Sequence, residues 1–266
     1  MGERAAVLRI GVGGALGRMG HALTEVLAGR ADAEVVAVYD RPDLAGQAVN
    51  GLTLTEAAAA LSACDVVIDF STPAATVAVA KLAAAAGGPA LVIGATGWTQ
   101  AEEAAVADAA RRVAIVKSGN YSLGVNVLAG LVEQTARRLA AADWDIEISE
   151  THHHRKIDAP SGTALMLGEA AAEGRGVGLG QVEVRARDGL TGPRPEGAIG
   201  FSSLRAGGIV GEHSVMFASE EEVLTLSHSA RDRKLFARGA VAAALWVAGK
   251  APGLYDMKDV LGFRGS

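Results

Sequence analysis

The run GVGGALGRMG at positions 11–20 decides the fold. It ends an apolar segment, residues 5–12, that predicts a buried strand, and it leads into a predicted helix over about residues 18–28. Glycines let the backbone turn tightly, and the start of a helix offers N–H groups and the positive end of its dipole to phosphates. Asp40 follows the next predicted strand, residues 34–39, where a carboxylate can accept hydrogen bonds from ribose hydroxyls. These features predict a dinucleotide-binding site, and a Rossmann-like unit that binds no nucleotide is the alternative.

The first half of the chain continues to alternate strand and helix. Short apolar runs at residues 65–70, 90–93 and 114–117 predict buried parallel strands. A helix is predicted to start at Thr99, because Thr99 and Glu102 have the spacing of a capping box. The alternation predicts an α/β fold with a Rossmann-type doubly wound parallel sheet.

The pattern changes after about residue 124. A long helix over residues 126–142 and a strand over residues 145–151 precede a loop and another helix. Four strand-like runs with little helix between them follow, at residues 181–187, 199–205, 213–218 and 222–228. This order predicts a second, α+β domain with a mixed or antiparallel sheet. Apolar alternation in the last runs, for example at Val215, Phe217, Val223, Leu224 and Leu226, suggests that the sheets pack between subunits.

The predicted domains are discontinuous. A last helix over residues 232–248 is expected to return to the first domain. Residues 1–123 and 232–266 then form a dinucleotide-binding domain, and residues 124–231 form a domain for substrate binding and oligomerisation.

Composition narrows the possible partners. The chain has 266 residues, enough for two domains, and a net charge of −5 with no sign of the clustered basic patch that nucleic acids require. Its single cysteine, Cys64, excludes an internal disulfide and suits a reducing cytoplasm. Lys81 interrupts the alanine-rich stretch at residues 74–86, so no apolar run is long enough to span a membrane. We expect a cytoplasmic protein without nucleic-acid or membrane partners.

Histidines and cations gather at residues 150–163, ETHHHRKIDAPSGT. Ser161 is placed to cap a helix after Pro160, and the N–H groups of Gly162 and Thr163 would then face outward as a carboxylate site. Lys156 and the histidines could surround the same anion and supply a proton. A metal site and a solvated basic loop are alternatives, but no acidic or histidine companion at helical spacing supports a metal.

The same residues carry a family resemblance. The run HHHRKIDAPSGTA at residues 152–164 strongly resembles the substrate-site motif of the dihydrodipicolinate reductases of bacterial and plant lysine biosynthesis. So do, in family order, the stretches VGGALGRMG, DFSTP, VIGATG, SGNYSLGVN, RAGGIVGEH and GLYDMKDVL. Together they span nearly the whole chain.

The resemblance implies a homotetramer that reduces 4-hydroxytetrahydrodipicolinate to tetrahydrodipicolinate with NADH or NADPH. His152 would be the catalytic acid, and Lys156 a proton donor or substrate anchor. The substrate would be held by His153, Gly162 and Thr163. The residues expected at the cofactor are Gly14, Ala15, Leu16, Gly17, Arg18, Met19, Asp40, Arg41, Gly94, Ala95, Thr96, Ser118, Gly119, Asn120 and Tyr121.

The chain differs from many family members at two of the expected cofactor positions. Many family members have Thr in place of Ala95, and Pro or Ala in place of Gly119, and we expect little effect because both positions work through the backbone. Strand alternation would group His152 with His154 and Lys156. The family pattern uses His153 instead of His154, and we follow it because the later proline and helix start predict an irregular loop.

Two adjacent residues, Asp40 and Arg41, bear on the choice of cofactor. Asp40 favours the free ribose of NADH, whereas Arg41 can pair with the 2′-phosphate of NADPH, so we expect dual use with a mild preference for NADH. The alternatives are another two-domain amino-acid dehydrogenase and a non-catalytic redox sensor that binds NADH. A sensor would lack the cluster of histidines and Lys156 that this chain keeps.

Overall fold

The computed structural model describes residues 6–264, which divide into two compact units. Unit 1 combines the described parts of residues 1–123 and 234–266, and unit 2 comprises residues 124–233. The last long helix therefore belongs to unit 1, although the whole of unit 2 separates it in sequence from the first part of unit 1. No helix in the described part of the chain is both long and apolar enough to cross a membrane.

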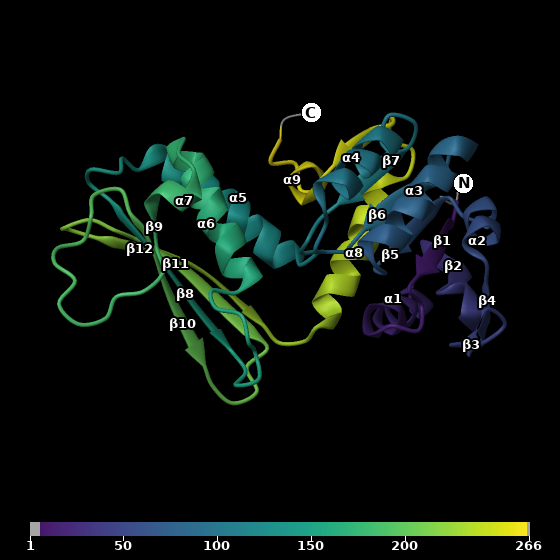
Figure 1. The fold of residues 1–266 in the computed structure, drawn as a ribbon, viewed down its shortest axis with the longest axis horizontal. Coiled ribbons are helices and arrows are strands. Elements are labelled where there is room, and N and C mark those ends of the chain that lie inside the picture. The colour runs from purple at the N-terminus through teal and green to yellow at the C-terminus, as the bar shows by residue number, and fades with distance from the viewer. Residues whose placement is uncertain (1–5, 265–266) are drawn as a thin grey trace, which may run out of the picture. The chain divides into compact units, whose positions relative to one another are not determined.

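Unit 1 is an α/β unit around one sheet (Figure 1). Its elements, in chain order, are β1 (Leu8–Gly13), α1 (Arg18–Ala28), β2 (Ala33–Tyr39), a 3-10 turn η1 (Pro42–Leu44), β3 (Ala48–Val49), β4 (Leu52–Thr55), α2 (Ala57–Ala63), β5 (Val66–Asp69), α3 (Pro73–Ala86), β6 (Ala90–Ile93), α4 (Gln100–Ala109), β7 (Ala114–Lys117), α8 (Lys234–Val247), β13 (Gly253–Tyr255) and α9 (Met257–Val260).

The sheet order of unit 1 is β13-β7-β6-β5-β1-β2-β4-β3, with all neighbours parallel except β3 and β4. The chain leaves β1 toward β2 on one side and later returns to β5 on the other, which makes the end of β1 a topological switch point. Gly13 lies in register with both Tyr39 and Asp69, Asp69 with Ile93, and Ile93 with Lys117. Five strands therefore end along one edge.

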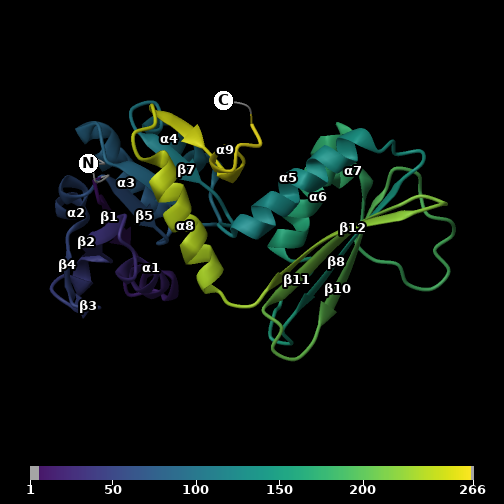
Figure 2. The ribbon, with the colours of Figure 1, turned by 180° about the vertical axis from the view of Figure 1, so that it is seen from behind.

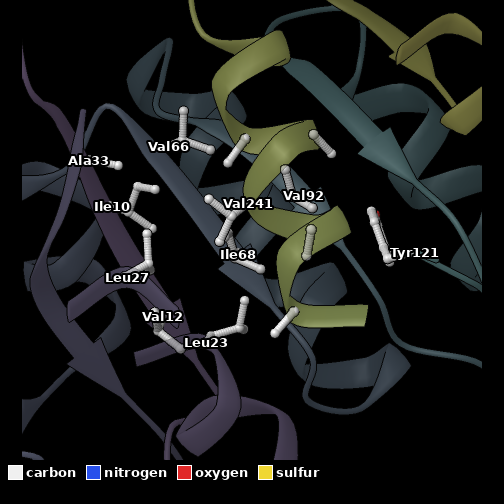
Figure 3. Close-up of a cluster of buried hydrophobic side chains, with 14 of the residues drawn as sticks. Ile10, Val12, Leu23, Leu27, Ala33, Val66, Ile68, Val92, Tyr121 and Val241 are labelled. Carbon is white, nitrogen blue, oxygen red and sulfur yellow. The ribbon is translucent and has the colours of Figure 1, made fainter. Parts of the chain in front are cut away.

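Helices cover both faces of this sheet, as the doubly wound prediction requires. Figure 3 shows Leu23 and Leu27 of α1 and Val241 of α8 packed with Ile10 and Ile68 of the strands. Residues of α2, α3 and α4 form a second cluster on the other face. The Rossmann-type fold class is confirmed.

Unit 2 is an α+β unit with a five-stranded mixed sheet in the order β12-β11-β8-β10-β9. Its elements are α5 (Leu123–Arg138), β8 (Asp145–His152), α6 (Gly162–Arg175), α7 (Leu179–Val182), β9 (Glu183–Val184), β10 (Ile199–Arg205), β11 (Gly211–Ala218) and β12 (Val223–Ala230). The central strand β8 pairs parallel with β10 and antiparallel with β11. In Figure 2, α5 and α6 lie along one face of the sheet. The apolar side chains of the sheet pack against these two helices.

Several predicted elements have other bounds in the structure. The strand expected at residues 181–187 is wrong, because α7 continues to Val182 and only Glu183–Val184 pairs with β10. The helix expected at residues 126–142 begins at Leu123 and ends at Arg138, where a turn leads the chain into β8. The first strand begins at Leu8, and residue 5 of its predicted range lies outside the described residues.

Candidate active site

The glycine loop connects β1 to α1 at the shared edge of unit 1. Gly14 has a φ of +66°, a conformation that glycine adopts without strain. A Cβ on Gly20 would lie 2.4 Å from the carbonyl oxygen of Ala15, so the helix approaches the loop this closely only because glycine is there. Gly17 is the N-cap of α1, with no side-chain cap and no acidic residue in the first turn. The start of α1 therefore fits an anion such as a pyrophosphate.

Asp40 holds this loop from the neighbouring strand. Its Oδ2 accepts a hydrogen bond from the N–H of Leu16 at 2.9 Å, and its Oδ1 accepts one from the N–H of Arg41 at 2.8 Å. The guanidinium of Arg41 is exposed and lies 3.7 Å from the carboxylate of Asp43. Because each carboxylate oxygen can accept more than one hydrogen bond, Asp40 can bind the loop and still receive a ribose hydroxyl.

Two further loops leave the same edge. Residues 94–96 follow β6 and residues 118–121 follow β7, and the N–H of Ser118 donates to the carbonyl of Ile93 at 3.2 Å. Thr96 and Gly119 are exposed. The register of the strands thus brings all four predicted cofactor segments to one edge.

Three predicted cofactor residues offer little beyond their backbone. Ala15 and Ala95 are buried, and so is Tyr121. The hydroxyl of Tyr121 donates to the carbonyl of Ile93 at 2.7 Å, and a Cβ on Gly239 of α8 would lie 1.6 Å from the carbonyl oxygen of Tyr121. The side chain of Tyr121 is therefore bound to the strands and is not available to a ligand, and the close contact with α8 is made by its backbone.

Asp69 at the end of β5 supports the glycine loop, and no role was predicted for it. This buried carboxylate accepts hydrogen bonds from Tyr39 at 2.6 Å, from Ser71 at 2.5 Å and from Thr76 at 2.9 Å. A Cβ on Gly13 would lie 2.5 Å from its Oδ2. Its place in the DFSTP stretch was the available indication.

In unit 2, β8 carries the histidine cluster to the start of α6. The strand ends at His152, and residues 153–160 form neither helix nor strand. This agrees with the irregular loop predicted from the sequence. Ser161 caps α6, with its Oγ accepting a hydrogen bond from the N–H of Ala164 at 3.1 Å. The space beside the Cα of Gly162 is open. The start of α6 therefore presents its first N–H groups without an obstructing side chain.

A buried carboxylate, Glu150, joins these parts. It is 2% exposed and accepts hydrogen bonds from both terminal nitrogens of Arg205 at 2.8 and 2.9 Å. Its Oε2 lies 2.5 Å from Nδ1 of His152, and its Oε1 accepts from the N–H of Ser161 at 3.2 Å. Burial opposes ionisation, but hydrogen bonds from Arg205 and His152 outweigh it and lower the pKa of Glu150 to about 2. Glu150 is therefore a carboxylate at neutral pH.

His213 lies beside this carboxylate network. Its ring meets that of His152 edge to face, with centroids 5.1 Å apart, and its Nε2 lies 3.0 Å from Oγ of Ser161. Burial lowers the pKa of His213 to about 4; the neighbouring His152, His228 and Lys156 lower this pKa further, and the carboxylate of Glu150 partly opposes them. His213 is therefore neutral at physiological pH.

The outer cations of the cluster have polar partners of their own. Nζ of Lys156 lies 2.7 Å from the carboxylate of Asp158, and Nη2 of Arg233 lies 3.5 Å from Nε2 of His153. Desolvation, with nearby arginines, lowers the pKa of His153. Within residues 6–264, no group of three or more His, Cys, Asp or Glu side chains is arranged to hold a metal ion.

His154 separates from its two neighbours. It is exposed, and its Nδ1 pairs with the carbonyl of Gly207 at 2.9 Å. The strand alternation that would have grouped His152 with His154 does not extend past the end of β8.

No role was predicted from the sequence for Glu150, Arg205 or His213, although each lies in a quoted segment. Arg205 stands opposite His152 across β10 and β8, and His213 stands opposite Glu150 across β11 and β8. These residues are brought together by strand register, which a single sequence does not reveal.

Two family models match almost the whole chain. The model described as dihydrodipicolinate reductase, N-terminus, matches residues 8–121, and the corresponding C-terminus model matches residues 124–261. The chain belongs to the dihydrodipicolinate reductase family. The predicted resemblance is therefore confirmed.

Relatives and solved structures agree with this family. The 4-hydroxy-tetrahydrodipicolinate reductase of Caulobacter vibrioides is 62% identical over 257 residues, covering 97% of this chain and 98% of the relative. That of Rhizobium rhizogenes is 53% identical, covering 96% and 97%. A dipicolinate-bound dihydrodipicolinate reductase from Paenisporosarcina sp. TG-14 superposes with a TM-score of 0.76 at 25% identity, covering 94% of this chain and 98% of that chain.

The fold alone is shared more widely. A DAP dehydrogenase from C. glutamicum has a TM-score of 0.56 at 12% identity, covering 97% of this chain and 96% of that chain. Other dehydrogenases thus use the same architecture, and the sequence identity decides the family.

Proposed function

We propose that this chain reduces 4-hydroxytetrahydrodipicolinate to tetrahydrodipicolinate with NADH or NADPH, in the diaminopimelate route to lysine. The observation that carries the proposal is the double contact of Glu150 in a chain of this family. One carboxylate touches both the ring of His152 and the N–H of Ser161, so a proton donor and an anion-binding helix start lie together. A small dicarboxylate needs this combination.

Different residues of unit 2 would bind the substrate and donate the proton. One substrate carboxylate would accept hydrogen bonds from the N–H groups of Gly162 and Thr163 at the start of α6. Lys156, now paired with Asp158, would exchange that partner for the substrate, and His153 would also contact the substrate. His152 would deliver the proton through Nε2, the ring nitrogen that does not face Glu150.

The residues of unit 1 would hold the cofactor. The start of α1 would receive the pyrophosphate, Asp40 the adenosine ribose, and the loops at residues 94–96 and 118–121 the nicotinamide end. When bound, the cofactor supplies the hydride. The overall reaction takes up one hydride and one proton and releases one water.

Cofactor preference rests on two adjacent side chains. Asp40 repels a 2′-phosphate, and its carboxylate already holds the loop through Leu16. Arg41 is exposed near Asp43 and would be free to turn toward that phosphate. We expect dual use with a mild preference for NADH.

We also propose a homotetramer that forms through the unit 2 sheet. The sequence pointed to Val215 and Phe217, but both are fully buried in the core of their own chain, because α5 and α6 cover that face. Within unit 2 the helices leave the opposite face open, and it carries Ser149, Thr151, Ser214, Met216, Val223 and Ser227. Light scattering should give about four times the chain mass of 27.0 kDa, and a stable monomer would contradict the assembly.

A coupled assay tests the reaction. Pyruvate and aspartate semialdehyde are supplied with the synthase that condenses them, and the absorbance of NADH or NADPH is followed. We expect oxidation of either cofactor that depends on both the synthase and this chain. Oxidation that is unchanged without the synthase would rule out the proposed substrate.

A further inference from the structure

Glu150 is a buried carboxylate to which the proposed reaction assigns no direct part. A carboxylate this deep is costly unless it is paired and hydrogen-bonded. Its pairing is complete, with the forked guanidinium of Arg205 on one side and His152 and Ser161 on the other. Such a group fits a positioning role better than a proton-transfer role, because its low pKa keeps it ionised.

We propose that Glu150 is a positioning residue that fixes the ring of His152 and, through the N–H of Ser161, the start of α6. This inference rests on the proposed function, because it assumes that His152 is the proton donor. One rigid carboxylate then sets the spacing between the donor and the N–H groups that bind the substrate.

The fold explains why this carboxylate is rigid. Glu150 and His152 are two residues apart on β8, so their side chains leave the same face of the sheet. Arg205 comes from the neighbouring strand β10, where it stands opposite His152. It also donates to the carbonyl of Asp158 at 2.6 Å, which ties the loop before α6 to the same cation.

The charge of Glu150 also selects the form of the histidine ring. A carboxylate can only accept hydrogen bonds, so the proton between the two groups lies on Nδ1 of His152. Nε2 is then the nitrogen that exchanges protons with the substrate. A glutamine in place of Glu150 would present either an oxygen or an NH₂ group, and it would no longer impose this choice.

A double-mutant cycle tests the proposal with Glu150→Gln, His152→Ala and the double variant. We expect Glu150→Gln to lower kcat by about 10- to 100-fold, since orientation of a general acid is part of its contribution of about 10²–10⁴. The Kd of dipicolinate should change by less than about threefold, because glutamine keeps an acceptor for Ser161. In the His152→Ala background, the Glu150 substitution should change kcat by less than about twofold, since both act as one unit.

Glu183→Gln is the matched control. Glu183 lies on the edge strand β9 of the same sheet, opposite Ile199, and its carboxylate is paired with Nε of Arg185 at 2.9 Å. This variant should keep the kcat of the wild type. Light scattering of each variant verifies that assembly is unchanged.

The outcomes separate the inference from the proposed function. A wild-type kcat in Glu150→Gln overturns the inference while His152→Ala remains impaired. A further loss of kcat in the double variant also overturns it, because a merely structural role acts without His152. Full turnover in His152→Ala instead overturns the proposed function.

If the Glu150→Gln variant does not fold, a spectroscopic measurement on the wild-type protein still tests the proposal. Solid-state NMR of wild-type protein with ¹⁵N-labelled histidine reports which ring nitrogens carry protons, and loss of one set of signals in His152→Ala assigns them. We expect a protonated Nδ1 at neutral pH. An unprotonated Nδ1 overturns the positioning role whatever the kinetics show.

Discussion

The candidate sites of the two units differ in the groups that form them: mainly backbone groups in unit 1 and mainly side chains in unit 2. The proposed cofactor edge of unit 1 is mostly backbone, shaped by glycines such as Gly14 and Gly20 and by the N–H groups at the start of α1. The proposed substrate site of unit 2 centres on Glu150, which side chains from separate strands and the backbone N–H of Ser161 all contact. The glycine loop and the helix start that follows it lie in one contiguous stretch of sequence, whereas the contacts of Glu150 depend on how strands pair.

The largest expected effect falls on the side-chain site. Lys156→Ala should lower kcat/KM by about 10²–10⁴, because the variant removes the cation placed to receive a substrate carboxylate or supply a proton. Steady-state kinetics in the coupled assay measure it. Lys81→Ala on α3 is the control and should behave as the wild type. A kcat/KM of Lys156→Ala close to the wild-type value would remove this residue from the site.

The backbone site should fail through geometry. In Gly20→Ala, the new Cβ would lie 2.4 Å from the carbonyl oxygen of Ala15, so the loop must shift. We expect the KM of NADH to rise about tenfold or more, with one decade for each 1.4 kcal/mol. Binding of dipicolinate should be unchanged. Gly29→Ala at the other end of α1 has open space and should be silent, and equal effects at both glycines would contradict the account.

Low pH should lower the free energy of unfolding through His213, which lies in the side-chain site. The pKa of His213 in the folded protein, about 4, is below the ordinary 6.5 because burial disfavours the cation. Unfolded chains then bind more protons between pH 6.5 and 4, so this contribution to stability is complete above pH 6.5 and is lost as pH falls toward 4. It amounts to roughly 3 kcal/mol at 1.4 kcal/mol per pKa unit.

Urea unfolding at pH 7.5 and 4.5, at one protein concentration, measures this effect. The stability difference between the two pH values should be smaller in His213→Gln than in the wild type. An unchanged difference would show that His213 does not titrate in this window.

The smallest expected effect concerns Arg41. The kcat/KM values for NADH and NADPH in the wild type should lie within about tenfold, or about 1.4 kcal/mol, of each other. Arg41→Ala should lose activity with NADPH and spare NADH, because only the former carries a 2′-phosphate. Both cofactors must be compared at one salt concentration. Equal losses with both would mean that Arg41 does not contact the phosphate.

The same contrast explains what the sequence could predict. Strands at residues 90–93, 114–117 and 199–205 have the predicted bounds, and Ser161 caps α6 as expected, because these features are local. The failed strand at residues 181–187 has β-like composition, but a local helix and a two-residue pairing replace it. Glu150, Arg205 and Asp69 gained their roles only from register and burial, which composition and spacing do not encode.

The most direct test of the central claim is the kcat of His152→Ala in the coupled assay. We predict a fall of about 10²–10⁴ with a modest change in KM, because a general acid acts on the transition state more than on substrate binding. Dipicolinate binding in the same variant shows whether the site remains intact. A kcat near that of the wild type would contradict the account, since the proton would then come from a residue other than His152.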